Sequence, residues 1–141
     1  MTVAEPPAAV ADFPTIADVV EAAHDKLSRE LWDYVTGGAE SEATLRRNRA
    51  AFDHIAFKPR VLRGVAGRDV STTFLGHELS LPVMFAPVGS TAHYHPDGAV
   101  ATARVSQRMG TITFLSSVCQ PDLEKVREGC PDGTLVYQLY I

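Results

Sequence analysis

The chain has 141 residues, of which 45% are hydrophobic and 21% charged, and its formal net charge is −4 at pH 7. These are the proportions of a globular protein, and they argue against a disordered or fibrous chain. The acidic balance disfavours nucleic acid and anionic membrane surfaces as partners. No apolar run approaches the roughly 20 residues that span a bilayer, and the first residues lack the basic and apolar regions of a signal peptide. We therefore expect a cytoplasmic protein without stable membrane insertion.

The first half of the chain predicts helices. Residues 1–13 are rich in Ala and Pro and form a flexible leader in this interpretation. From Thr15 onward, apolar residues recur every three or four positions, as on one face of an amphipathic helix: Ile16, Val19, Val20, Ala23, Leu27, Leu31 and Tyr34. Thr15 and Asp18 resemble a capping box, and Gly37 with Gly38 ends the helix because glycine accepts the left-handed conformation. A second helix is expected over residues 41–52, with its arginines exposed.

A hairpin is expected next, within RDVSTTFLGHELSLP, with its turn near Gly76 and His77. Residues 14–81 therefore comprise helices and a hairpin that precede the main fold.

Residues 82–141 follow a different pattern. Apolar runs at 82–88, 111–117 and 134–140 alternate with helical segments at 98–110 and 121–129. Uninterrupted apolar strands that alternate with helices indicate a parallel sheet covered on both faces, so the fold class is α/β. A doubly wound sheet and a (β/α)8 barrel begin identically, and the pattern alone does not separate them. The last residues, TLVYQLYI, form the middle of such a run, and we expect the chain to be the N-terminal part of a longer protein.

Polar residues and small residues gather where these strands end. The first strand closes on residues 86–89 (APVG), the second on Ser116 and Ser117, and the third carries Gln138 and Tyr140. Binding groups of parallel α/β folds cluster at these carboxyl ends, and hydroxyls with an amide suit the edge of a heteroaromatic ring. The alternative is that the serines cap the next helix and Gln138 is an ordinary buried amide. No GxGxxG, P-loop or GxSxG motif is present.

No metal site is predicted. His93 and His95 flank Tyr94, but Cys119, Cys130 and the carboxylates supply no matching set of ligands. The histidine loop is better explained as a turn into the following helix.

Three segments carry a resemblance to a known family: WDYVTGGAESEATLRRNRAAFDHIAFKPRVL, LPVMFAPVGSTAHYHPDGAVATARVSQRMGTITFLSS and YQLY. Their order and spacing resemble the FMN-dependent α-hydroxy-acid oxidases and dehydrogenases, which include glycolate oxidase, lactate oxidase and mandelate dehydrogenase. The resemblance implies a (β/α)8 TIM barrel with FMN at the carboxyl ends of its strands. Residues 82–141 would be the first three strands of an incomplete FMN-binding barrel.

The resemblance also assigns site residues. Tyr34 matches a tyrosine that binds the substrate carboxylate, and Tyr140 matches the catalytic tyrosine that contacts the substrate hydroxyl. The backbone of Pro87, Val88 and Gly89 matches the stretch against the flavin ring, and Ser116 and Gln138 match residues that bind its pyrimidine side. Gly89 stands where many oxidases have alanine, and Val118 stands where glycolate oxidase-like members have a bulky aromatic residue.

The implied reaction is the oxidation of a small L-2-hydroxy acid of the lactate, glycolate or mandelate type to the 2-oxo acid. The base histidine, the arginine that clamps the carboxylate and the lysine near the flavin belong to later strands and have no counterpart in this chain. The resemblance further implies a homo-oligomer for the full-length protein. The alternative is a truncated half-barrel that serves as a binding or assembly module without catalysis.

Overall fold

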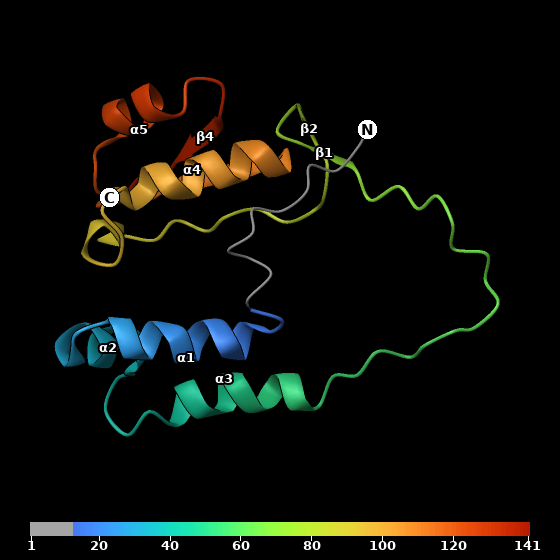
Figure 1. Ribbon diagram of the computed structural model, residues 1–141, viewed down its shortest axis with the longest axis horizontal. Helices are drawn as coiled ribbons and strands as arrows, with labels where there is room; N and C mark the ends of the chain where they lie inside the picture. Colours follow the sequence, from blue (N-terminus) through green and yellow to red (C-terminus); the bar gives the residue numbers. More distant parts are fainter. Residues whose placement is uncertain (1–12) are drawn as a thin grey trace. The chain divides into compact units, whose positions relative to one another are not determined.

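The computed structural model describes residues 13–141, which fall into two compact units divided between Lys58 and Pro59 (Figure 1). The division places the hairpin in the same unit as residues 82–141, whereas the sequence suggested a boundary after residue 81. The leader expected over residues 1–13 lies almost wholly outside the described residues. Within the described part of the chain, no helix has the length and apolar character needed to cross a bilayer.

The first unit contains three helices, α1 (Ile16–Lys26), α2 (Arg29–Thr36) and α3 (Ala43–Asp53). The prediction of one continuous helix from residue 16 to Tyr34 is wrong. Leu27 and Ser28 adopt extended conformations between α1 and α2, and the Ser28 hydroxyl accepts the Leu31 N–H at 3.3 Å. Serine is among the preferred N-cap residues, so the chain restarts a helix there although the apolar spacing continues across the break.

α2 ends at Gly37, as the sequence predicted, but the predicted reason, a left-handed glycine, is wrong. Gly37 is extended, with φ −75° and ψ 157°, and not left-handed. A Cβ on Gly37 would lie 2.6 Å from the Asp33 carbonyl oxygen, and one on Gly38 would lie 3.2 Å from the Leu45 side chain. The two glycines are therefore needed for the close approach of the chain as it turns toward α3.

The start of α1 confirms the predicted capping box. The Thr15 side chain accepts the Asp18 N–H, and the Asp18 carboxylate accepts the Thr15 N–H at 2.7 Å. Hydrogen bonds from the Thr15 hydroxyl and then from its backbone N–H lower the pKa of Asp18 below its ordinary value of 3.8.

We predict that this box loses its stabilising contribution in acid. Because the folded-state pKa of Asp18 is depressed, the contribution is present above pH 3.8 and is lost as the pH falls through the folded-state pKa. An NMR titration of the Asp18 carboxyl should give a midpoint below 3.8 in the wild type, and Thr15→Val should move it upward. A wild-type midpoint unaffected by Thr15→Val would contradict the prediction.

The first regular element of the second unit is the predicted hairpin, formed by β1 (Thr72–Phe74) and β2 (His77–Leu79). Phe74 pairs with His77, so the turn consists of Leu75 and Gly76, both with positive φ, 50° and 77°. This is the backbone of a two-residue turn of the type that matches strand twist. The ring of Phe74 meets that of Phe114 edge to face, with centroids 6.3 Å apart, so the hairpin packs on the main sheet.

The main sheet is parallel and runs in chain order. β3 (Ile112–Leu115) pairs with β4 (Thr134–Tyr137), and Phe85 forms a parallel bridge with Thr113 on the other side of β3. This order differs from that of flavodoxin-like sheets, in which the first strand lies between the next two.

The first predicted strand, residues 82–88, is reduced to that single bridge, and the prediction of a continuous strand is wrong. Phe85 donates its N–H to the Ile112 carbonyl at 3.0 Å and accepts the Phe114 N–H at 2.9 Å. The next donor in a parallel ladder would be the amide of residue 87, and Pro87 has no N–H. The bridge therefore stops where the loop toward α4 begins.

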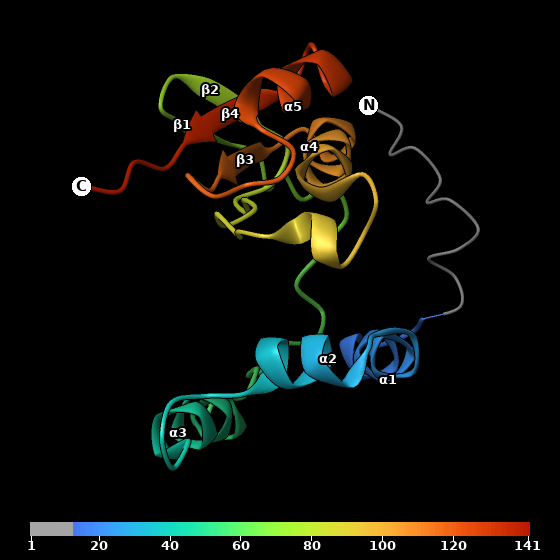
Figure 2. The ribbon, with the colours of Figure 1, turned by 90° about the vertical axis from the view of Figure 1, so that its left-hand side faces the viewer.

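α4 (Gly98–Met109) and α5 (Leu123–Gly129) cover the same side of β3 and β4 (Figure 2). Their contact with the sheet buries the core of this unit: Ala99, Val100, Ala103, Leu115, Val126 and Cys130. The alternation of the strand places Thr113 and Leu115 toward α4 and leaves Ile112, Phe114 and Ser116 on the opposite side. Both helices and the strands β3 and β4 confirm the expectations from the sequence.

The loop after β3 is fastened to the beginning of α4. The carbonyl of Gln120 accepts the Ala99 N–H at 3.0 Å and the Thr91 hydroxyl at 3.2 Å. Gly98 has φ 47°, and a Cβ there would lie 2.1 Å from the same carbonyl oxygen. Only glycine meets both requirements at this position.

We predict that Gly98→Ala lowers the free energy of unfolding by about 3 kcal/mol, from backbone strain and forced displacement of Gln120. The matched control is Gly67→Ala, because Gly67 also has a positive φ, 74°, but open space around its Cβ position. The control should cost about 1 kcal/mol. Urea unfolding of the two variants measures the difference, and equal losses would contradict the role of Gln120.

Candidate functional site

The three parallel strand segments end side by side, and their ends form the candidate site. Gln138 donates its N–H to the Leu115 carbonyl at 2.8 Å, so the ladder continues one step beyond β4. The register that pairs Leu115 with Tyr137 places Ser116 beside Gln138, and both alternate onto the face away from α4. The Phe85 bridge brings residues 86–89 to the other side of Ser116.

Ser116 is buried, and its hydroxyl accepts the Val118 N–H at 3.2 Å. One lone pair is used in this way, and the hydroxyl proton remains able to donate. The helix-cap alternative is wrong for both serines. α5 is capped by Asp122, whose carboxylate accepts the Lys125 N–H at 3.1 Å.

Two polar atoms at these strand ends are buried without a hydrogen-bond partner: Gln138 Oε1 and Ser117 Oγ. A third, Thr113 Oγ1, lies on the opposite face of β3. Buried polar atoms are nearly always paired in folded proteins, and each exception needs an explanation. An unpaired acceptor on Gln138 next to a potential donor on Ser116 matches the edge of a flat ring that carries both N–H and C=O groups.

A cavity of about 230 Å³ lies between the first two strand ends and α4. Its lining includes Ala86, Val88, Thr113 and Ser116. Thr113 and α4 line this cavity, so it lies on the α4 side of β3, whereas the side chains of Ser116 and Gln138 alternate onto the other face. Gly89 approaches Ser116 from the side: a Cβ on Gly89 would lie 3.5 Å from Ser116 Oγ.

The two remaining predicted residues, Tyr140 and Tyr34, are exposed to solvent. Tyr140 follows Gln138 by two residues and is 62% exposed. Tyr34 lies on α2 in the other unit and is 73% exposed. The structure thus brings together Pro87, Val88, Gly89, Ser116 and Gln138, and it leaves the two tyrosines as predictions.

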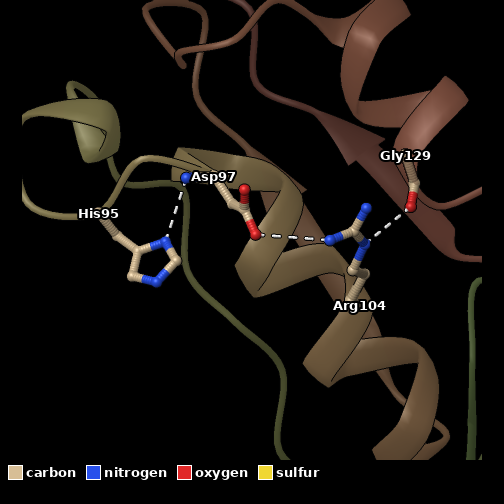
Figure 3. A network of polar contacts seen from close by, with 4 residues as sticks. All are labelled: His95, Asp97, Arg104 and Gly129. Carbon is tan, nitrogen blue, oxygen red and sulfur yellow. Dashed lines mark hydrogen bonds and ion pairs between the residues drawn. The ribbon is translucent and has the colours of Figure 1, made fainter.

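A larger surface groove of about 570 Å³ lies between α4 and α5, and its Arg104 and Asp97 pair with each other. Arg104 donates to the Gly129 carbonyl at 3.0 Å and to the Asp97 carboxylate at 3.4 Å, and the Asp97 N–H donates to His95 Nδ1 at 3.1 Å (Figure 3). These contacts hold the two helices together and occupy one ring nitrogen of His95. Volume alone therefore does not identify the site.

The described residues support neither a metal centre nor a nucleophilic cysteine. Among residues 13–141, no cluster of three or more His, Cys, Asp or Glu side chains is arranged to hold a metal ion. Burial raises the pKa of the Cys119 thiol, so this cysteine stays protonated at neutral pH and is a poor nucleophile.

Val118 is the residue at this site whose role sequence reasoning missed. Its carbonyl accepts the Ser90 N–H at 3.2 Å, and its side chain lies against Gly89. The resemblance had marked position 118 only as one where relatives carry a bulky aromatic residue, and the contact with Gly89 was missed because it joins segments almost thirty positions apart.

We predict that Ser116→Ala lowers the free energy of unfolding by about 1 kcal/mol in the absence of flavin, because it leaves the Val118 amide without an acceptor. Ser117→Ala is the matched control, since the Ser117 hydroxyl has no partner to lose. Urea unfolding of both variants tests the difference. A loss in Ser117→Ala as large as that in Ser116→Ala would show that the Val118 contact is not stabilising.

Comparisons with known proteins identify the family of this chain. The family model described as FMN-dependent dehydrogenase matches residues 23–141. Glycolate oxidase 3 of Arabidopsis thaliana is 41% identical over 130 residues, which cover 92% of this chain and 35% of that protein. Glycolate oxidase of Spinacia oleracea is 42% identical over 119 residues, which cover 84% of this chain and 32% of that protein.

Solved structures give the same result. A soluble mutant of the membrane-associated (S)-mandelate dehydrogenase from Pseudomonas putida matches with a TM-score of 0.82 and 33% identity, over 89% of this chain and 36% of that one. A mandelate oxidase matches with a TM-score of 0.83 and 30% identity, over 91% of this chain and 37% of that one. The chain spans about a third of the length of the curated relatives it matches. With its family model matched over most of its length, the chain belongs to the FMN-dependent dehydrogenase family.

Proposed function

We propose that this chain is the N-terminal part of an enzyme that oxidises a small L-2-hydroxy acid to the 2-oxo acid with FMN. Membership of the family supports the cofactor and the reaction class, and the relatives named glycolate oxidase and mandelate dehydrogenase support the substrate class. The single observation that carries the assignment to these residues is the unpartnered Gln138 Oε1 beside Ser116 at the strand ends.

The residues present fit the ring of a flavin. Its pyrimidine edge carries an N–H donor and carbonyl acceptors, which complement Gln138 Oε1 and the Ser116 hydroxyl. In this proposal the backbone of Pro87, Val88 and Gly89 lies against the ring. FMN, when bound, supplies the acceptor for the two electrons that leave the hydroxy acid.

The two tyrosines are proposed to bind substrate. A phenol O–H can donate to the carboxylate of a 2-hydroxy acid, and this role is assigned to Tyr34. Tyr140 is assigned to the hydroxyl side of the substrate, where its O–H can donate to the oxygen that loses its proton during oxidation. Tyr140 follows Gln138 by two residues, so an extended backbone would direct both side chains to the same face.

The complete reaction needs a base, which must lie elsewhere in the protein. We propose that the three strand segments described above are the first of a (β/α)8 barrel, which takes about 250 residues in full. The base histidine, the arginine and the lysine implied by the family belong to the later strands. The 141-residue chain alone is therefore expected to turn over no hydroxy acid.

The intact mass of the protein purified from its native cells is the first test. We expect a mass well above 15.3 kDa, bound FMN, and oxidation of at least one of lactate, glycolate and mandelate. Gln138→Leu should weaken FMN binding about tenfold by removing the acceptor, whereas Gln120→Leu, an exposed amide outside the strand ends, should leave it unchanged. A mass of 15.3 kDa without activity would instead favour a binding or assembly module.

A further inference from the structure

Val118 joins the first strand end to the second through both its backbone and its side chain. Its N–H donates to Ser116 Oγ at 3.2 Å, and its carbonyl accepts the Ser90 N–H at 3.2 Å. Its Cγ2 lies 2.6 Å from the position that a Cβ on Gly89 would occupy. Ser116, Val118 and Gly89 therefore form one connected unit at the strand ends.

Gly89 fits this position because a side chain there would clash with its neighbours, and not because its backbone conformation requires glycine. Gly89 is not among the residues with positive φ, so its backbone conformation is open to other residues. A methyl group at this position would meet Val118 Cγ2 well inside van der Waals contact. Both backbone polar groups of Val118 are held, so relief must come from rotation of its side chain or from movement of residues 87–90.

Val118 is itself about half exposed, and the hydrophobic core does not hold its side chain. Its contacts at this site are therefore with the neighbouring strand end. A β-branched side chain has few rotamers, which makes it a firm support for the chain segment that lies on it.

We propose that Val118 is a positioning residue that fixes the Pro87–Gly89 backbone relative to Ser116. This inference rests on the proposed function, because Pro87–Gly89 and Ser116 are the groups assigned there to the flavin. It follows that the effect of a side chain at position 89 depends on the residue at position 118. The pair, and not position 89 alone, determines how closely this backbone approaches the ring.

A double-mutant cycle on the native gene product tests the proposal, with Gly89→Ala, Val118→Ala and the two combined. The first readout is hydrogen exchange of the Ser90 amide without flavin, and the second is FMN affinity from quenching of flavin fluorescence. Gly89→Ala should speed the exchange and weaken FMN binding, each about tenfold, and addition of Val118→Ala should recover most of both losses. If the double variant instead shows the sum of the two single losses, with no recovery of protection or affinity, the proposal is overturned.

Val118→Thr is the matched control, because threonine keeps the shape of valine and the contact with Gly89. It should not rescue Gly89→Ala, and by itself it should leave the Ser90 exchange near the wild-type rate. Val118→Ala alone should speed that exchange, which keeps the test decisive if Gly89→Ala does not fold. Equal exchange at Ser90 in Val118→Ala and Val118→Thr would contradict the positioning role.

The two readouts separate this inference from the proposed function. If the wild-type protein does not bind FMN, the proposed function fails, and the Ser90 exchange still decides whether Val118 holds the segment. If the exchange rates are coupled but FMN affinity is the same in all variants, Val118 fixes the backbone without positioning it for flavin, and the proposal is wrong.

Discussion

The parallel ladder between the first strand segment, β3 and β4 is the constraint on which the site depends. Its hydrogen bonds at Phe85 and Gln138 bring three chain segments to a common edge, although they are separated by helices in the sequence. Ser116 and Gln138 become neighbours only through this register. A shift by one residue would turn either side chain to the opposite face of the sheet, so the polar edge and the packing of α4 and α5 are established together.

The elements near the strand ends are also tied to one another by backbone carbonyls. The Gln120 carbonyl accepts the amide of Ala99 at the start of α4, and the Val118 carbonyl accepts the amide of Ser90. In both cases the loop that follows β3 supplies the acceptor, and the segment after the first strand supplies the donor, from its loop at Ser90 and from the start of α4 at Ala99. The loop of β3 thus fixes its neighbour, and it leaves no room for a Cβ at position 98, beside the Gln120 carbonyl, or at position 89, beside the Val118 side chain.

Much of this arrangement was predictable from local patterns. The elements β3, β4, α4, α5, the hairpin and the capping box at Thr15 are encoded by residues close in sequence, and the structure confirms them. The break at Ser28 was missed because the apolar spacing continues through it, and a single capping serine outweighs that pattern. The shortening of the first strand follows from Pro87, whose missing N–H is visible in the sequence but matters only once its partner strand is known. The contact of Val118 with Gly89 was not predictable, since it depends on the distance between two loops.

The polar groups that occupy the N-termini of α4 and α5 also bear on phosphate binding. In the described part of the second unit, the start of α4 is filled by the Gln120 carbonyl, and that of α5 by the Asp122 carboxylate. The first three amides of α4 are hydrogen-bonded to His95, Gln120 and Asp97, and Asp122 places a negative charge at the start of α5. Neither helix start therefore favours an anion, although helix N-termini commonly hold phosphate groups. Under the proposed function, the strand ends would therefore recognise the flavin ring and not the phosphate attached to it. By themselves they would discriminate poorly between FMN and riboflavin, and selection for the phosphorylated form would then depend on other parts of the protein.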